Sequence, residues 1–171
     1  MRNRIGILLG LLLYAQGAVA MEPAAALVPN AAMVGRGVLS YAFWDVYEAR
    51  LYAPEGNWVS TKPHVLSITY FRTINGRDIA DRSVQEMRKQ GFTDEVKLAA
   101  WNTQLKAILP DVRDGTVLSA VRLPGMQTNF YHGTDAIGTI KGDEFGSLFF
   151  GIWLGEATSE PGLRRALLGL P

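Results

Sequence analysis

The chain has 171 residues, contains no cysteine, and carries 17 Lys and Arg against 16 Asp and Glu. Such a near-neutral chain lacks the basic surface that nucleic-acid binding requires, so we expect no nucleic-acid partner. Without cysteine there is no disulfide framework, thiol nucleophile or thiolate metal site. The two histidines, His64 and His132, lie far apart in sequence. We therefore expect neither a metal ion nor another cofactor.

The N-terminus predicts export. Arg2 and Arg4 precede an apolar run over residues 5–14, and Ala18-Val19-Ala20 follows. This layout is typical of a secretory signal peptide, and the run is shorter than the about 20 residues that a membrane-spanning helix needs. We expect cleavage after Ala20, a periplasmic or secreted location and no stable membrane span. A retained N-terminal anchor is the alternative.

The remaining chain predicts one domain. About 150 residues fit a single domain, and 48% hydrophobic residues suffice for an ordinary core. Residues 21–32, rich in Ala and Pro, predict a flexible segment leading to a domain over 33–171. GRGVLS at 35–40 has only part of a dinucleotide-binding fingerprint, and the residues after it continue as a strand, so we expect no nucleotide site.

The first half of the domain predicts strands followed by two helices. Period-two alternation indicates two strands, or one long bent strand, over 33–53, and a further strand over 64–72. Asn75 is the expected cap of a helix that ends at Gly91. A second helix is expected from Thr93 as its N-cap to Pro110, with an apolar stripe on one face.

The second half repeats this order. Residues 116–133 predict a hairpin that turns at Pro124-Gly125, and 135–141 predict another short strand. Helices are expected from Asp143 to Gly155 and from Pro161 to Gly169. Strands separated by paired helices indicate an α+β fold with a large antiparallel sheet and helices on one face. A groove between these layers is a suitable place for a small apolar ligand.

Tyr47 is the first candidate for a ligand-binding residue. In FWDVYEARLYAP, residues 43–54, period two places Tyr47 on the same face as Ala49 and Leu51, and places Glu48 and Arg50 on the opposite face. Tyr47 therefore faces the interior or the groove. The alternative is a core tyrosine whose hydroxyl is satisfied by a neighbour.

Three further residues complete the predicted site. Tyr70 and Arg72 share a strand face with Leu66, so the guanidinium would lie at the end of an apolar face, where it could pair with a carboxylate or a phenolate. Arg36 is a second candidate cation. For both arginines the alternative is a solvent-exposed side chain or a surface ion pair.

An ordered set of segments resembles the chalcone isomerase-like family, especially its exported bacterial members. The segments are GRGVLSYAFWDVYEARLYAP, SITYFRTINGRDIADRSVQEM, a helix bearing Trp101, and FYHGTDAIGTIKGDEFGSLFFGIWLGEATSEPGLRRALLG. Together they span residues 33–169. The resemblance implies an open-faced β-sandwich, a large antiparallel sheet packed with helices, which agrees with the element order above.

The resemblance also implies positions for the catalytic groups of chalcone isomerases, and most are not matched. The catalytic arginine falls on Leu39 and the catalytic threonine on Tyr47; the other positions fall near Arg77 or Asp78, near Val84 or Gln85, and on Leu163. The sequence is similar instead to the non-catalytic, fatty-acid-binding relatives, in which a tyrosine in a Val-Tyr-x-x-x-Leu-Tyr pattern and an arginine hold a carboxylate. Residues 46–52 match that pattern.

We therefore expect a non-enzymatic exported protein that binds a small amphipathic ligand such as a fatty acid, through Tyr47, Arg72, Arg36 and Tyr70. One alternative is an intramolecular lyase or isomerase acting on an unsaturated carbonyl compound, for which the same four residues would have to converge on one cavity. The other is a structural or partner-binding envelope protein, which an exposed apolar patch with Trp44 or Trp153 beside a closed interior would favour. The sequence names no protein partner.

Overall fold

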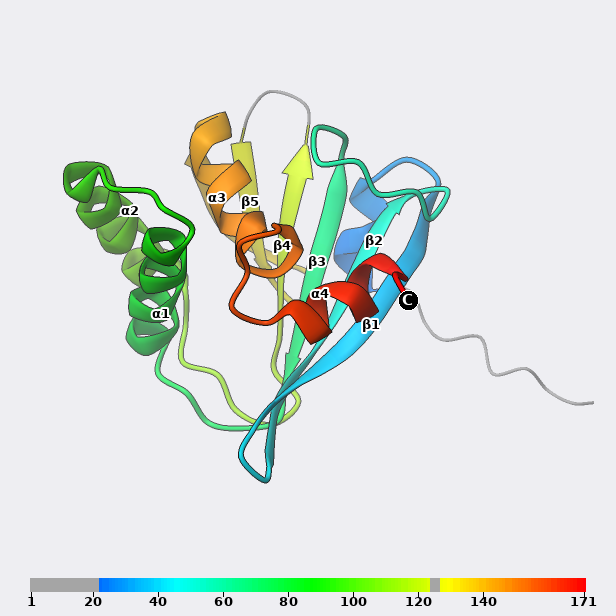
Figure 1. The fold of residues 1–171 in the computed structure, drawn as a ribbon, viewed down its shortest axis with the longest axis horizontal. Helices are drawn as coiled ribbons and strands as arrows, with labels where there is room; N and C mark the ends of the chain where they lie inside the picture. The colour runs from blue at the N-terminus through cyan, green and yellow to red at the C-terminus, as the bar shows by residue number, and fades with distance from the viewer. Residues whose placement is uncertain (1–21, 124–126) are drawn as a thin grey trace, which may run out of the picture.

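A computed structural model describes residues 22–123 and 127–171, and its centre is one antiparallel sheet of six strands (Figure 1). The strands follow one another in chain order, and each pairs with the next. They are β1 (Ala31–Tyr41), β2 (Trp44–Pro54), β3 (His64–Tyr70), β4 (Val117–Leu123), β5 (Gln127–His132) and β6 (Asp135–Lys141). The α+β fold class and the large antiparallel sheet are confirmed.

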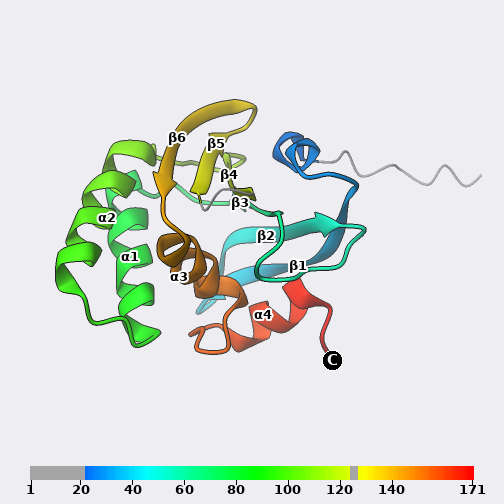
Figure 2. The same cartoon turned by 90° about the horizontal axis from the view of Figure 1, so that it is seen from above.

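Four helices cover one face of this sheet (Figure 2). They are α1 (Gly76–Lys89), α2 (Glu95–Ile108), α3 (Asp143–Leu154) and α4 (Pro161–Leu168). Between helices and sheet lies the main core, which includes Leu51, Leu66, Met87 and Phe145, all 1% exposed or less. None of the helices in the described residues is long and apolar enough to cross a bilayer.

The segment expected to be flexible is ordered over its described part, which corrects the prediction for residues 21–32. A 3-10 helix, η1 (Pro23–Leu27), covers the sheet face opposite the four helices. It buries Ala24 and Ala25 against Tyr52, Val65 and Val121. Small apolar residues allow this close packing. An alanine-rich composition does not by itself distinguish such a packed segment from a flexible one. The predicted signal peptide and the Pro124-Gly125 turn lie outside the described residues.

The glycines of GRGVLS serve helix packing. A Cβ at Gly35 would lie 2.3 Å from the carbonyl oxygen of Ala166, and one at Gly37 would lie 2.7 Å from the Leu163 side chain. Both contacts come from α4, which packs along β1. Only residues without a Cβ permit this approach, because such distances are far inside van der Waals contact.

Two predicted helix caps differ from the structure. The second helix begins after Asp94, whose side chain accepts a hydrogen bond from the Lys97 amide at 3.0 Å, so Asp94 and not Thr93 is the N-cap. At α1 the Asn75 side chain makes no capping hydrogen bond. The carboxylate of Asp111, distant in sequence, accepts from the Gly76 amide instead. A capping group that comes from a distant part of the chain leaves no signal in the sequence next to the helix.

Candidate functional site

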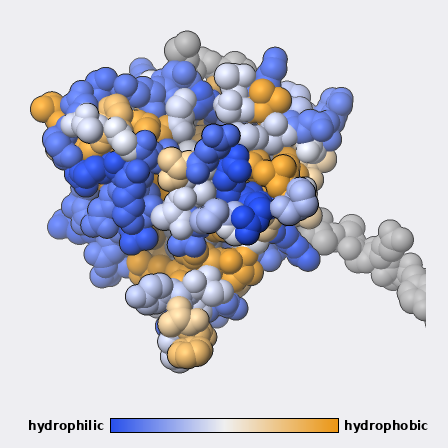
Figure 3. Space-filling model, viewed as in Figure 1, coloured by the Kyte–Doolittle hydropathy of each residue, from blue (hydrophilic) through white to orange (hydrophobic). Residues whose placement is uncertain are grey.

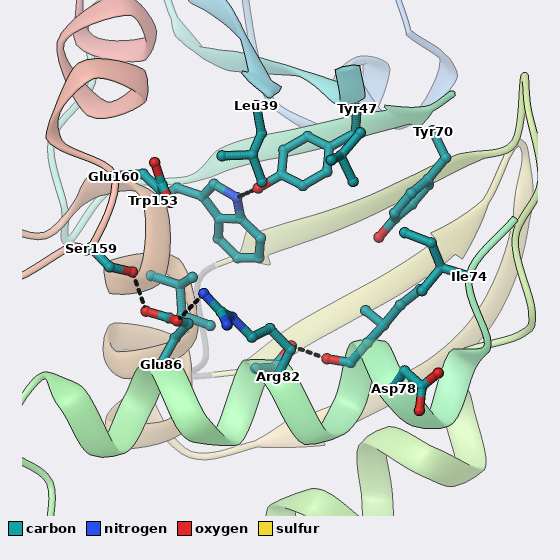
Figure 4. Close-up of a pocket in the computed structure, with 14 residues that line it drawn as sticks. Leu39, Tyr47, Tyr70, Ile74, Asp78, Arg82, Glu86, Trp153, Ser159 and Glu160 are labelled. Carbon is teal, nitrogen blue, oxygen red and sulfur yellow. Dashed lines mark hydrogen bonds and ion pairs between the residues drawn. The ribbon is translucent and has the colours of Figure 1, made fainter. Parts of the chain in front are cut away.

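A cavity of about 190 Å³ lies between the sheet and α1, closed on one side by α3 and the segment after it. Its position follows from strand register, since Tyr47 on β2 pairs with Leu39 on β1 and with Tyr70 on β3. Three adjacent strands thus present side chains to the same place. The cavity is lined by Leu39, Val46, Tyr47, Tyr70, Ile74, Asp78, Ile79, Arg82, Ser83, Glu86, Ile152, Trp153, Ser159 and Glu160 (Figure 4).

Tyr47 holds its hydroxyl in this cavity as a neutral hydrogen-bond donor. The hydroxyl oxygen accepts a hydrogen bond of 2.8 Å from Trp153 Nε1 (Figure 4). Burial raises the pKa of Tyr47 to about 12, because it disfavours the charged phenolate more than the Trp153 bond stabilises it. Among the described residues no group accepts the hydroxyl proton, which is therefore available to a ligand.

Tyr70 places a second phenol beside the first. Its ring packs edge-to-face against the Tyr47 ring, with centroids 5.9 Å apart. Burial raises the pKa of Tyr70 as well, and the neighbouring phenol of Tyr47 adds to this shift. Its hydroxyl makes no side-chain hydrogen bond within the described part of the chain. The cavity thus contains two neutral phenols with unused donors, which suits an oxygen acceptor on a ligand.

The α1 side of the cavity carries an ion-pair cluster centred on Glu86. Glu86 accepts from Arg82 at 2.8 Å, from Lys89 at 2.9 Å and from the Ser159 hydroxyl. Burial alone would raise the pKa of Glu86, but the bonds from Ser159 and Lys89 and the charge of Arg82 outweigh it, so the pKa is lowered. Glu86 is therefore ionised, and Arg82 is already paired.

The charges that line the cavity are mostly negative. Arg82 is the single cation among the lining residues, whereas Asp78, Glu86 and Glu160 supply three carboxylates. An anionic head group would meet this excess of negative charge. A neutral hydrogen-bond acceptor on a ligand, bound at the two phenols, would not be repelled by these carboxylates.

A smaller apolar chamber of about 40 Å³ continues the cavity into the core. Tyr70, Ile79, Ser83 and Trp153 line both spaces, and the inner one reaches Phe149 on α3. An apolar tail that entered past the phenols would point into this chamber.

The structure brings two of the four predicted site residues together. Tyr47 and Tyr70 line the cavity, but Arg36 and Arg72 do not. Arg36 is exposed on β1, paired in register with Arg50. Arg72 lies beyond the end of β3, with its guanidinium carbon 4.5 Å from the Trp44 ring centroid. The expectation that either arginine completes the site with Tyr47 is corrected.

Sequence reasoning missed Arg82, Glu86 and Trp153. Arg82 and Glu86 lie three and seven residues after Ile79, which places them on the sheet-facing side of α1 by helical period. That spacing was a usable signal for the helix face but not for its distance to Tyr47. Trp153 is 106 residues from Tyr47, and no local pattern joins them. Within the described residues no group of three or more His, Asp or Glu side chains is placed to hold a metal ion.

The positions implied for chalcone isomerase catalysis are gathered only in part at the cavity. Leu39, Tyr47 and Asp78 line the cavity, and Leu39, at the arginine position, carries no charge. Leu163 packs on Gly37 from α4, in the core. The convergence of Tyr47, Tyr70, Arg36 and Arg72 that the isomerase alternative requires is not present.

Comparisons with known proteins agree with this architecture. The sequence model described as chalcone isomerase-like matches residues 24–169. No curated protein matches the chain. Among solved structures, the crystal structure of a fatty-acid binding protein from Arabidopsis thaliana superposes with a TM-score of 0.62 at 14% identity, covering 81% of this chain and 87% of that one. At this identity the likeness establishes the shared fold, while the family match extends over nearly all of the described residues. The chain belongs to the chalcone isomerase-like family.

Proposed function

We propose that the protein is a non-enzymatic binding protein for a small amphipathic molecule, such as a fatty acid, held in the cavity beside Tyr47. The observation that carries this proposal is the pair of unused phenol donors, Tyr47 and Tyr70, inside an apolar-walled space. The fatty-acid binding protein that shares the fold supports the same ligand class.

The head group binds as a neutral acceptor in this proposal. A carboxyl or carbonyl oxygen accepts from the two phenols, and the negative lining around Arg82 disfavours the ionised carboxylate. The tail follows Ile79 and Trp153 into the inner chamber.

Cavity size limits the ligand. A volume of 190 Å³ holds about six water-sized groups, at roughly 30 Å³ each. With the inner chamber of about 40 Å³ added, the space holds about eight such groups, which is the number of non-hydrogen atoms in hexanoic acid. Hexanoic acid therefore fits without rearrangement, whereas longer chains must displace core side chains such as Phe149.

The test is extraction of the purified protein with organic solvent and mass spectrometry of the extract, followed by titration with hexanoic and octanoic acids. Tyr47→Phe and Tyr70→Phe each remove one donor and are expected to lower affinity. Tyr41→Phe removes a phenol hydroxyl that is exposed at the end of β1, and serves as the matched control. An empty extract together with no binding of either acid would refute the proposal.

The partner-binding alternative requires an exposed apolar patch and a closed interior, and only the patch is present. Phe43, Tyr41 and Trp44 are 97%, 79% and 59% exposed at the end of the β1–β2 hairpin, which projects from the fold (Figure 3). Trp153, in contrast, is buried, and the interior beside it contains the cavity. Ligand binding therefore remains the preferred function.

Export is part of the proposal and depends on residues 1–20 alone. N-terminal sequencing of the protein recovered from cells is expected to begin at Met21. A mature chain that retains Met1 contradicts it.

A further inference from the structure

The β1–β2 hairpin ends in an aromatic tip formed by Tyr41, Ala42, Phe43 and Trp44, which extends past the rest of the sheet (Figure 1). Its three rings are the most exposed aromatic side chains in the described part of the chain. None of the four residues lines the Tyr47 cavity, so the hairpin tip belongs to no site described above.

The residues of the turn are not those that a stable turn favours. Tyr41 pairs with Trp44, so Ala42 and Phe43 form a two-residue turn. Such turns favour Asn-Gly, Asp-Gly or Gly-Gly, because their central residues take positive φ angles. Ala42 has a φ of 53°, in the left-handed region that a Cβ disfavours. Turn stability does not account for an alanine followed by an exposed phenylalanine, whereas a role for the ring in binding does.

A β-bulge connects the hairpin tip with the cavity. Leu39 pairs with Tyr47, whereas Ser40 pairs with Asp45, so Val46 is the extra residue on β2. Leu39, Val46 and Tyr47 all line the cavity, as expected where two residues of a bulge lie opposite one on the partner strand. The Ser40 hydroxyl donates to the Asp45 carboxylate at 2.6 Å, which ties the two strands together just before the tip.

The same bulge determines the face on which the tip residues lie. Trp44 is two residues before Val46, and Tyr41 is two residues after Leu39, so alternation places both on the face of the cavity. Directly opposed residues of an antiparallel pair share a face, which agrees with the pairing of Tyr41 with Trp44. Without the bulge, Trp44 would lie on the opposite face from Tyr47. The sheet face that forms the cavity therefore continues to the hairpin tip.

The charges next to the hairpin tip balance. The guanidinium carbon of Arg72 lies 4.5 Å from the centroid of the Trp44 ring, and Asp45 follows Trp44 in sequence. Tyrosine and tryptophan rings are enriched where membrane proteins meet lipid head groups, because each ring has an apolar body and a polar group. A guanidinium at the edge of such rings is placed to pair with a lipid phosphate. The hairpin tip has this composition.

The size of the hairpin tip favours a bilayer over a protein partner. At roughly 150–250 Å² per ring, the exposed parts of the three rings offer about 500 Å². A stable protein complex buries about 800 Å² on each partner, and it needs a complementary surface. A bilayer needs no such complementarity, since binding to it increases with the apolar area that enters.

We propose that the hairpin tip inserts into the surface of a lipid bilayer, with the rings of Tyr41, Phe43 and Trp44 at the level of the head groups. Because the adjacent charges balance, a zwitterionic phosphatidylcholine bilayer is sufficient. Docking would bring the Tyr47 cavity, whose lining begins two residues away on the same face, close to a surface where amphipathic molecules concentrate. This consequence rests on the proposed function, whereas docking itself does not.

The test is sedimentation of the protein with phosphatidylcholine vesicles in the absence of any acid. It uses the chain that begins at Met21, so that the apolar run over residues 5–14 contributes nothing. Phe43→Ser and Trp44→Ser each remove one exposed ring and are expected to weaken vesicle binding at least tenfold. Val96→Ser removes an exposed apolar side chain of α2, and as the matched control it should bind like the unaltered protein.

Tryptophan fluorescence shows which part of the protein meets the lipid. Vesicles should shift the emission of the unaltered protein to shorter wavelength, because the exposed Trp44 ring leaves water. Trp44→Phe retains an apolar ring, so it should still bind vesicles, but the emission shift should disappear. A shift that persists in Trp44→Phe would mean that another part of the molecule meets the lipid, against the proposal.

Two further results would overturn the proposal. One is the absence of vesicle binding by the unaltered protein. The other is undiminished binding by both Phe43→Ser and Trp44→Ser. Self-association in solution that Phe43→Ser abolishes, without vesicle binding, would instead identify the hairpin tip as an interface between copies of the chain. Hexanoic acid affinity, measured without vesicles, should be the same in Phe43→Ser and in the unaltered protein, so failure of docking and failure of the proposed function are distinguishable.

Discussion

Two cavities, one on either side of α3, differ in the polar groups and the charges that line them. The Tyr47 cavity has apolar walls, two phenols with unused protons and an excess of carboxylates. A second cavity, of about 230 Å³, lies beside His64 at the opposite end of β3 from Tyr70. It is lined instead by the Arg122–Asp143 ion pair and by Trp58 and His64, each of which has a buried ring nitrogen without a hydrogen-bond partner among the described residues. Helix α3 separates them, because Ile152 and Trp153 face the first space while Ser147 and Phe150 face the second. The two ends of β3 therefore differ in the polarity and charge of the residues around them.

The largest expected difference between the two cavities is in the pH dependence of the free energy of unfolding, to which His64 contributes and Tyr47 does not. His64 has a folded pKa of about 4 against about 6.5 unfolded, so the unfolded chain binds the proton first between these values. Stability contributed by neutral His64 is complete above pH 6.5 and is lost as the pH falls to 4, by about 3 kcal/mol. Tyr47, with a pKa of about 12, makes no such contribution in this range.

Urea unfolding at pH 7 and pH 4 measures this difference. His64→Phe should lose much of the pH dependence, whereas Tyr47→Phe and His132→Phe should keep it. Carboxylates that titrate in the same range are common to all four proteins and cancel in the comparison. An unaltered pH dependence in His64→Phe would show that the ring is not held neutral by burial.

Head-group charge is the next largest effect, and it concerns the Tyr47 cavity alone. If only the neutral acid binds, hexanoic acid loses about tenfold in apparent affinity per pH unit above its pKa, hence about 100-fold between pH 5 and pH 7. The neutral ketone 2-heptanone should bind equally at both pH values. Calorimetric titration measures both.

Affinity for hexanoate that holds constant or rises with pH would contradict the neutral head group. Arg82 would then have to leave Glu86 and pair with the ligand carboxylate. In that case Arg82→Ala should abolish binding, while Arg72→Ala, outside the cavity, should not.

Blocking each cavity in turn should show which of them binds the acid. Ser83→Leu adds bulk where the Tyr47 cavity meets its inner chamber, and is expected to reduce hexanoic acid affinity at least tenfold, about 1.4 kcal/mol. Ser147→Trp fills the other space and should leave hexanoic acid affinity unchanged. It is therefore the control for Ser83→Leu. Loss of hexanoic acid binding in both proteins would mean that the cavities are coupled or the fold is damaged.

Sequence patterns located features that depend on one strand and missed those that depend on packing between elements. Tyr47 was placed inward because period two is local, and Ala49 and Leu51, on the same face of β2, are fully buried. The prediction for Arg72 was wrong because β3 ends at Tyr70, and beyond the end of a strand the period-two alternation no longer determines on which face a side chain lies.

Helix-to-sheet packing determined the rest of the site. Arg82 reaches the cavity only because α1 crosses the sheet at Tyr47, and no sequence spacing encodes that crossing. His64 had a usable signal, since it shares the inward face of Leu66 and Ile68 by period two. The identity of its unpaired nitrogen depends on the Lys62 carbonyl, a local detail that only the structure supplies.

The smallest expected effect concerns how Trp153 orients the Tyr47 phenol. Its indole donates to the hydroxyl oxygen at 2.8 Å, so the hydroxyl proton is left for the ligand. Trp153→Phe removes that donor and should lower hexanoic acid affinity about fivefold, as loss of one hydrogen bond of about 1 kcal/mol implies. Trp44→Phe, at an exposed ring outside the cavity, is the matched control and should bind normally. Equal losses of hexanoic acid affinity in Trp153→Phe and Trp44→Phe would contradict an orienting role for Trp153.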